Sequence, residues 1–419
     1  MRIAIAIGLI VLFAWNCSSA QTPTFDLPND FYPILSWDLP HWSAKPFSDP
    51  ALGVRGLRDC GFNTAAFVRP EHLKDCERLG VKCILAAPKF PIPWRTLSDA
   101  QIELIVRTLV GEGSKSPAVI GYFLMDEPGA GEFPALAKAV AAVKKLAPGK
   151  LAYINLFPNY ATIGAKDISQ LGTATYADYL EQYVSIVHPQ FISYDNYQIV
   201  FSGDQRNAAL AASYYTNLLE VRGVAMKNHI PFWQIVSSNQ LTADAAIPSP
   251  ANLSLQAYTT LAAGAKGLTW YTYFSTGYLY APIDGAGKPT ATWSMLRMVN
   301  EQIATLGPIV SKLVSTGVYF TDPQPAAGLG KLPGEAIASI KCATPLMVGE
   351  FKASDGSAER YAMIVNLSLR ESTRFELTLV KGGEVQQYSP VDGSLSALEK
   401  GNALRLTAGQ GVLVRIATK

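Results

Sequence analysis

Eight short apolar runs recur between residues 34 and 274, and helix signals separate most of them. Each run has roughly the four to eight residues of a buried strand. The runs are Ile34–Asp38, Phe62–Val68, Lys82–Pro88, Val119–Pro128, Leu151–Pro158, Phe191–Gln198, Pro231–Ser238 and Gly267–Phe274. Strands that alternate with helices at this spacing form parallel crossovers, so eight of them predict a (β/α)8 barrel.

Helix boundaries support this prediction. Ser98 and Gln101 form a capping box before an apolar helical face, and Pro134 stands near the expected start of another helix. Pro148 and Gly149 then end that second helix. A doubly wound open sheet is the alternative fold, but no glycine-rich phosphate-binding pattern follows the first run.

The pattern changes near residue 315, where short alternating runs replace the strand–helix rhythm. The runs are Met347–Phe351, Tyr361–Asn366, Phe375–Leu379, Val385–Tyr388, Ala403–Leu406 and Gly411–Ile416, and glycine-containing turn signals separate several of them. This pattern predicts a small antiparallel β-sandwich. We therefore expect a signal peptide over 1–20, a barrel over 21–314 and a sandwich over 315–419.

The N-terminus predicts export. Arg2 precedes the apolar run Ile3–Trp15, and small residues ending at Ala20 form a plausible cleavage site. We expect a secreted or periplasmic protein cleaved near Ala20. Cys17 raises the alternative of a lipoprotein, but Ala14–Asn16 matches poorly the small residues that such processing requires. The later sequence contains no run long and apolar enough to predict a membrane span.

Composition narrows the function. Of 419 residues, 49% are hydrophobic and 16% are charged. The net charge is only +2 and the sequence contains no run of Lys and Arg, which argues against nucleic acid as a binding partner. The sequence shows no metal-ligand cluster or phosphate-binding loop, so we expect no metal and no cofactor. Cys60, Cys76 and Cys83 could supply one disulfide or stay buried free thiols. Nothing in the sequence indicates an oligomeric state.

The run Val119–Pro128 carries the clearest chemical signal. It ends in Asp126 and Glu127, and Pro128 cannot continue a strand because it lacks an N–H donor. Barrel enzymes keep their reacting groups at the carboxyl ends of the strands. The two acids are therefore candidates for catalysis, and the alternative is an acidic turn that only solubilises a strand end.

Two segments carry a family resemblance. The first is Gly121-Tyr122-Phe123-Leu124-Met125-Asp126-Glu127-Pro128, and the second is Ala262-Ala263-Gly264-Ala265-Lys266-Gly267 leading into Trp270-Tyr271-Thr272-Tyr273. With the architecture of residues 30–310, they resemble clan A barrel glycoside hydrolases, most nearly family 42-like proteins. The resemblance implies a carbohydrate substrate, with Glu127 as general acid/base. The clan usually has Asn where this chain has Asp126.

The seventh run departs from the clan, which expects a nucleophilic Glu there. Pro231–Gln240 contains no acid, and Gln234 cannot act as that nucleophile. Glycoside hydrolysis needs a second carboxylate, for which Asp195 is the first candidate and Asp38 a weaker one. Asp195 could instead bind a sugar hydroxyl. The rival function is a non-catalytic carbohydrate-binding protein, and an Asp195 side chain pointing toward Glu127 would favour the enzyme.

Aromatic and amide side chains gather near the strand ends. Aromatic planes stack on sugar rings and amides bind hydroxyls, although inward strand residues also fill a barrel whatever its function. The substrate-binding candidates are Trp37, Asp38, His41, Asp126, Asn155, Tyr194, Tyr197, Trp233, Gln234, Trp270 and Tyr273. Whether the reaction retains or inverts the anomeric configuration depends on the separation of the carboxyl groups.

Overall fold

The computed structural model describes residues 27–38, 47–201, 208–275, 277–398 and 403–418. The predicted signal peptide, its cleavage site near Ala20, Cys17 and His41 all lie outside these residues.

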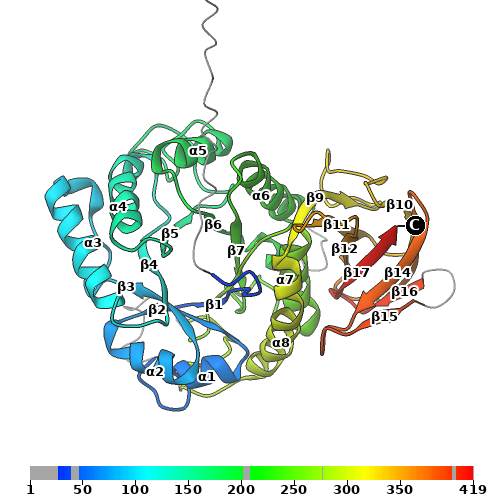
Figure 1. The fold of residues 1–419 in the computed structure, drawn as a ribbon, viewed down its shortest axis with the longest axis horizontal. Helices are drawn as coiled ribbons and strands as arrows, with labels where there is room; N and C mark the ends of the chain where they lie inside the picture. The colour runs from blue at the N-terminus through cyan, green and yellow to red at the C-terminus, as the bar shows by residue number, and fades with distance from the viewer. Residues whose placement is uncertain (1–26, 39–46, 202–207, 276, 399–402, 419) are drawn as a thin grey trace, which may run out of the picture.

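Eight parallel strands close into a barrel, which confirms the predicted fold (Figure 1). Each strand pairs with the next one along the chain, and β1 pairs with β8 to close the circle. The strands are β1 (Ile34–Trp37), β2 (Thr64–Val68), β3 (Lys82–Ala86), β4 (Val119–Asp126), β5 (Leu151–Leu156), β6 (Ile192–Asp195), β7 (Phe232–Ser237) and β8 (Leu268–Tyr271). All eight predicted runs contain one of these strands.

Helices surround the barrel. The predicted capping box forms, because the Gln101 N–H donates to the Ser98 hydroxyl over 3.4 Å at the start of α3. The helices are α1 (Val54–Asp59), α2 (Leu73–Leu79), α3 (Asp99–Gly113), α4 (Phe133–Leu146), α5 (Tyr176–Gln182), α6 (Ala208–Lys227), α7 (Pro250–Ala262) and α8 (Ala291–Ser311). Short helical turns are η1 (Pro70–His72), η2 (Trp94–Thr96), η3 (Ala130–Glu132), η4 (Tyr183–Val187) and η5 (Gln198–Phe201).

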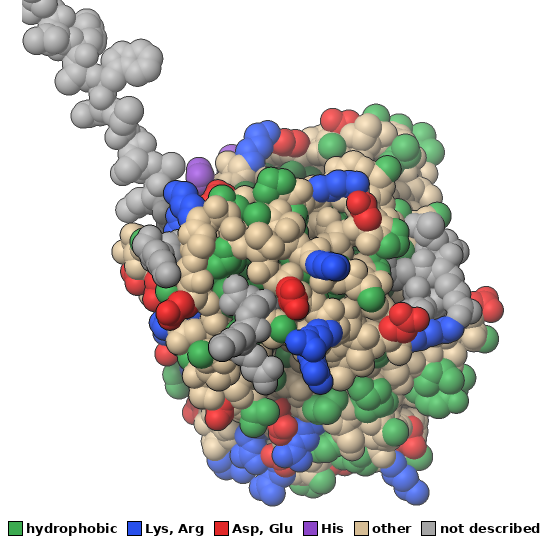
Figure 2. Space-filling model, turned by 90° about the vertical axis from the view of Figure 1, so that its right-hand side faces the viewer, with side chains coloured by type: hydrophobic (Ala, Val, Ile, Leu, Met, Phe, Trp, Pro, Cys, Tyr) green, Lys and Arg blue, Asp and Glu red, His purple; other side chains and the backbone are tan. Residues whose placement is uncertain are grey.

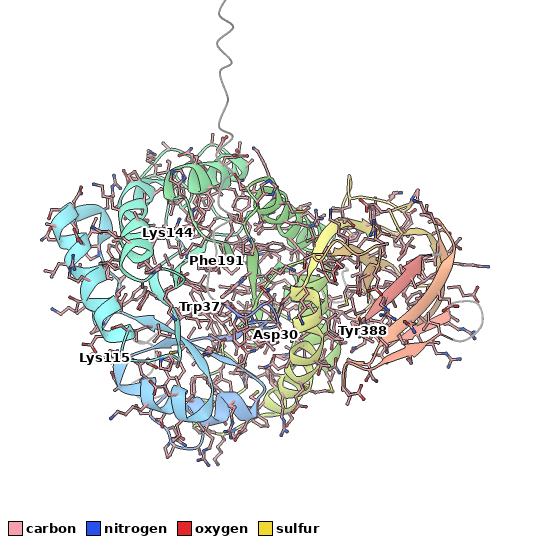
Figure 3. All side chains as sticks on the ribbon, viewed as in Figure 1. Asp30, Trp37, Lys115, Lys144, Phe191 and Tyr388 are labelled. Carbon is pink, nitrogen blue, oxygen red and sulfur yellow. The ribbon has the colours of Figure 1, made fainter. Side chains whose placement is uncertain are left out.

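Aromatic side chains fill the barrel interior. Figure 3 places Trp37 and Phe191 inside the ring of helices. The Phe67 and Phe123 rings stack with centroids 3.7 Å apart, and Trp37 meets Phe67 edge-on at 4.7 Å. At the amino ends of the strands, Phe191 packs on Trp233 at 4.8 Å. This packing leaves only the carboxyl ends of the strands for a polar site.

The C-terminal region forms two antiparallel sheets, as predicted. One has six strands in the order β15-β14-β17-β12-β11-β9, and the other has three in the order β10-β13-β16. The strands are β9 (Leu313–Phe320), β10 (Ile337–Lys341), β11 (Leu346–Ala353), β12 (Arg360–Asn366), β13 (Thr373–Leu379), β14 (Gly383–Tyr388), β15 (Leu395–Ala397), β16 (Ala403–Leu406) and β17 (Gly411–Thr418). The predicted boundary at residue 315 falls inside β9, and the sequence did not predict β9, β10 or β15.

Helix α7 joins the barrel to the six-stranded sheet (Figure 1). Every residue from Asn252 to Ala262 is buried, since one side of α7 covers the barrel and the other covers β11 and β12. The contact is close at Gly349 of β11, where an added Cβ would stand 1.8 Å from the Ala262 carbonyl oxygen. The six-stranded sheet is therefore held to the barrel by direct packing against α7 and not only by the chain that connects them.

The described surface mixes charges of both signs. Figure 2 shows Lys and Arg side chains interspersed with Asp and Glu over one face. Among the described residues, no helix is long and apolar enough to span a membrane. Cys60, Cys76 and Cys83 are buried free thiols, which answers the question of the disulfide that the sequence left open.

Candidate active site

Three carboxyl groups meet at the carboxyl ends of β4 and β6. Asp126 is the last residue of β4, Glu127 follows it, and Asp195 is the last residue of β6. The Glu127 and Asp195 carboxyl groups are hydrogen-bonded to each other. Asn155 of β5 lies between the two strands, and its Nδ2 donates to Asp126 Oδ1 over 3.1 Å and to Asp195 Oδ1 over 2.9 Å.

A chain of hydroxyl groups fixes the orientation of the Asn155 amide. The Ser193 hydroxyl donates to Asn155 Oδ1 over 3.1 Å, and the Tyr153 and Ser193 hydroxyl oxygens are 2.9 Å apart. Because Ser193 uses its proton on Asn155, Tyr153 is the donor to Ser193. Asn155 therefore presents its N–H groups, rather than its oxygen, to Asp126 and Asp195.

The surroundings shift the pKa values of Glu127, Asp195 and Asp126 by different causes. Burial raises the pKa of Glu127, and the nearby charges of Asp195 and Asp126 raise it further. The hydrogen bond within the pair raises the pKa of Glu127 and lowers that of Asp195, although burial leaves the pKa of Asp195 raised overall. Burial also raises the pKa of Asp126 to about 6, against a lowering by Asn155. Every influence named for Glu127 raises its pKa, whereas Asp195 and Asp126 each accept a hydrogen bond from Asn155 that lowers theirs, so Glu127 has the strongest tendency of the three to keep a proton.

Tyr160 is a site residue that we did not predict. It lies in the loop after β5, and its hydroxyl lies near the Tyr197 backbone and the Gln198 side chain. Although 43% of the Tyr160 surface is exposed, partial burial of its hydroxyl raises the pKa of that group, and the charges of Asp195 and Glu127 raise it further, which places it beside the carboxyl pair. Its position two residues past the predicted run Leu151–Pro158 was the available signal, because barrel enzymes also keep site residues in the loops that follow the strands.

Tyr197, which we predicted as substrate-binding, lies just after β6 at the mouth of the barrel, the end formed by the carboxyl ends of its strands, and it packs beside another tyrosine. Its ring centroid is 5.2 Å from that of Tyr271, whose hydroxyl is 3.0 Å from the Tyr278 hydroxyl. The charges of Asp126 and Asp195 contribute to the raised pKa of Tyr271, after burial and Tyr278. These tyrosines form an aromatic wall near the carboxyl groups.

Four predicted binding residues face the helices instead of the mouth, which corrects the prediction. Tyr194 lies in the core between strands and helices, and the Gln234 Oε1 accepts from the Thr260 hydroxyl of α7 over 2.8 Å. Trp270 Nε1 donates to Asn300 of α8, and the Tyr273 hydroxyl accepts from Trp293 Nε1. Strand residues alternate in direction, so the inward neighbours Asp195 and Tyr271 oblige Tyr194 and Trp270 to point outward.

The other two predicted tryptophans, Trp37 and Trp233, fill the barrel interior. Trp233 packs against Phe191 at the amino ends of the strands, opposite the site, so its predicted sugar contact is wrong. Trp37 ends β1 on the site's side of the barrel, with only 2% of its surface exposed. A sugar contact by Trp37 stays a prediction.

Asp38 is separate from the carboxyl pair. Its Oδ1 accepts the Phe274 N–H over 3.0 Å, which ties the end of β1 to the loop after β8. The side chain is buried, and burial raises its pKa to about 7 against a lowering by this hydrogen bond. We therefore assign Asp38 a structural role, and the described residues also contain no cluster of three or more possible metal ligands.

We expect Asp38→Asn to change how stability depends on pH. The folded-state pKa of about 7 exceeds the ordinary value of 3.8, so unfolding releases a proton between these values and stability falls as pH rises through them. This one group should cost on the order of 4 kcal/mol at pH 8 relative to pH 4. Urea unfolding at both pH values should show a smaller loss in the variant, and equal losses would contradict the assignment.

Comparison with known proteins supports the fold. No protein-family model matches the chain, and no curated protein matches it. A catalytic mutant of Gan42B, a GH42 beta-galactosidase from G. stearothermophilus, superposes with a TM-score of 0.65 at 9% identity, over 92% of this chain and 98% of that one. A glycoside hydrolase family 5 protein from Bacteroides vulgatus superposes with a TM-score of 0.56 at 12% identity, over 93% and 90%. The chain thus has the fold of these glycoside hydrolases, which confirms the architectural resemblance predicted from its sequence.

Proposed function

We propose that this protein is an exported glycoside hydrolase that cleaves O-glycosidic bonds with Glu127 as general acid/base and Asp195 as the second carboxylate. The hydrogen-bonded Glu127–Asp195 pair at the strand ends is the observation that carries this proposal. The glycoside hydrolase fold of the compared structures supports it. Export rests on the N-terminal sequence, with Arg2 and the apolar run before Ala20.

Each carboxyl group has a distinct task. Glu127 holds the proton of the pair, so it protonates the departing glycosidic oxygen as the bond to the anomeric carbon breaks. Asp195 is ionised when Glu127 is protonated, and Asn155 fixes its Oδ1. It is therefore placed to attack the anomeric carbon or to stabilise its positive charge. Asp126 raises the proton affinity of Glu127 without taking the proton itself.

The closeness of the pair favours retention of configuration. Inverting enzymes hold their carboxyl groups about 6.5–9.5 Å apart to admit a water molecule, and retaining enzymes hold them about 5–5.5 Å apart. Two hydrogen-bonded carboxyl groups match the shorter arrangement, with Asp195 as nucleophile. The first sugar product seen by proton NMR should have the anomeric configuration of the substrate, and the opposite anomer would assign Asp195 as a base.

The position of Asp195 favours an enzyme over a binding protein. Strand β7 carries no acid, which was the reason to consider a barrel without catalysis. A second carboxyl group lies beside Glu127 all the same, because Asp195 points toward it rather than toward a helix, and this supports the enzyme.

The test is hydrolysis of aryl glycosides and polysaccharides by the purified protein and by Asp195→Asn. We expect turnover of at least one substrate by the wild type and a loss of about a hundred- to ten-thousandfold in the variant. Saturable sugar binding by both proteins without turnover would instead establish the binding function.

A further inference from the structure

Glu127 has a backbone conformation that side chains rarely adopt. Its φ is +44°, in the left-handed region that favours glycine. A residue with a Cβ stays there only where its surroundings fix it, and such residues cluster at functional sites. Because Glu127 directly follows β4, this turn of the backbone determines where its carboxyl group points.

Two hydrogen bonds hold the peptide groups around this turn. The Glu127 N–H donates to the Asn155 carbonyl oxygen over 2.8 Å. On the other side, the Tyr179 hydroxyl donates to the Pro128 carbonyl oxygen over 2.7 Å. Pro128 has no N–H of its own, so its carbonyl is the group through which the backbone can be held at this residue.

Tyr179 of α5 connects two strand ends with one hydroxyl group. Besides donating to Pro128, it accepts the Phe157 N–H over 3.4 Å, just after β5. Its side chain is fully buried, and its ring packs on Phe133 at 5.3 Å and on Tyr176 at 5.9 Å. Burial raises the pKa of this hydroxyl well above its ordinary value, so it stays a donor to Pro128 throughout the neutral range.

We propose that Tyr179 is a positioning residue for Glu127: its hydroxyl clamps the strained turn so that the Glu127 carboxyl stays against Asp195. This inference rests on the proposed glycosidase function. Without the clamp, the left-handed turn would relax toward ordinary backbone angles. The Glu127 carboxyl would then move away from the glycosidic oxygen while the substrate pocket stayed intact.

The chain offers a matched control on the same helix. Tyr176 is also a buried tyrosine of α5, and its hydroxyl donates to the Phe157 carbonyl oxygen over 3.0 Å. Tyr176→Phe therefore removes a buried hydrogen bond to the end of β5 without touching Pro128. Tyr179→Phe removes the bond to Pro128 together with the longer one from the Phe157 N–H, and both changes delete a single oxygen atom.

The experiment compares phenyl and 2,4-dinitrophenyl glycosides of the sugar that the wild type hydrolyses. Phenol needs a proton to leave and dinitrophenol does not, so only the first substrate reports on Glu127 as acid. A small displacement of a reacting group can cost roughly a hundredfold in rate. We expect Tyr179→Phe to lower kcat/KM for the phenyl glycoside about ten- to a hundredfold, with the dinitrophenyl glycoside and both rates of Tyr176→Phe nearly unchanged.

The ratio of the two rates keeps the test decisive even if Tyr179→Phe folds poorly, because the folded fraction cancels from it. A ratio equal to that of the wild type would overturn the positioning role. If Glu127→Gln shows the leaving-group dependence and Tyr179→Phe does not, only this inference fails. If the rate of Glu127→Gln shows no dependence on the leaving group, or if the wild type hydrolyses no glycoside, the proposed function fails and this inference fails with it.

Discussion

Glu127→Gln should lower kcat/KM for a phenyl glycoside by about a hundred- to ten-thousandfold, the usual worth of general acid catalysis. The amide keeps the shape of the side chain but has no acidic proton to give to the glycosidic oxygen. The same variant should hydrolyse a 2,4-dinitrophenyl glycoside with kcat/KM near that of the wild type. Parallel kinetics on both substrates provide the measurement.

The pH dependence of Glu127→Gln provides a second check. Glu127 must be protonated to act, so wild-type activity should fall as pH rises through its raised pKa. The variant should lose this alkaline limb, because no proton is left to titrate at that position. An unchanged alkaline limb, or equal losses on both leaving groups, would assign the acid to another residue.

Gly349→Ala should destabilise the whole protein by about 3 kcal/mol, at the upper end of the usual cost of overpacking. The new Cβ would stand 1.8 Å from the Ala262 carbonyl oxygen, and a backbone atom cannot rotate away as a side chain can. The steric overlap can be relieved only if α7 moves away from β11 of the six-stranded sheet. Gln256 of α7 hydrogen-bonds both the N–H and the carbonyl of Ser237 at the end of β7. A movement of α7 should therefore also weaken the packing of the barrel.

Gly111→Ala is the control for this prediction. Gly111 is an exposed residue of α3 with open space around an added Cβ. Alanine in a helix interior is worth about 0.5–1 kcal/mol more than glycine, so this variant should be slightly more stable. Urea unfolding of both variants tests the pair, and a Gly349→Ala protein within about 0.5 kcal/mol of the wild type would contradict the packing described for α7.

The barrel could be predicted because its determinants are local. Each buried parallel strand reads as a short apolar run, and features such as the Ser98 capping box mark the helices between them. The ends of runs then selected Glu127 and Asp195, since a proline or a polar cluster stops a strand where barrel enzymes keep their chemistry. Strands β9 and β10 were missed because they pair with β11 and β13, which lie farther along the chain, and β15 was missed because it has three residues with none buried.

The direction of a side chain was harder to predict than its strand. Tyr194 and Trp270 share strands with the site residues Asp195 and Tyr271 but point to the helices, as Gln234 of β7 does, and fixing their direction requires the register of the barrel. Tyr160 and Tyr179 lie outside the strand runs. The position of Tyr160 just past the fifth run was its only local signal, and the role of Tyr179 depends on its hydrogen bond to Pro128, which no local pattern encodes.

Covalent trapping of Asp195 would test the proposed catalytic pair most directly. A 2-deoxy-2-fluoro glycoside with a dinitrophenyl leaving group slows both steps of a retaining reaction but the second most, so the sugar stays attached to its nucleophile. Peptide mapping by mass spectrometry should find the fluorosugar on Asp195, and Asp195→Asn should carry none. A label on Asp38 or Asp126 would contradict the assignment of Asp195 as the carboxylate that works with Glu127.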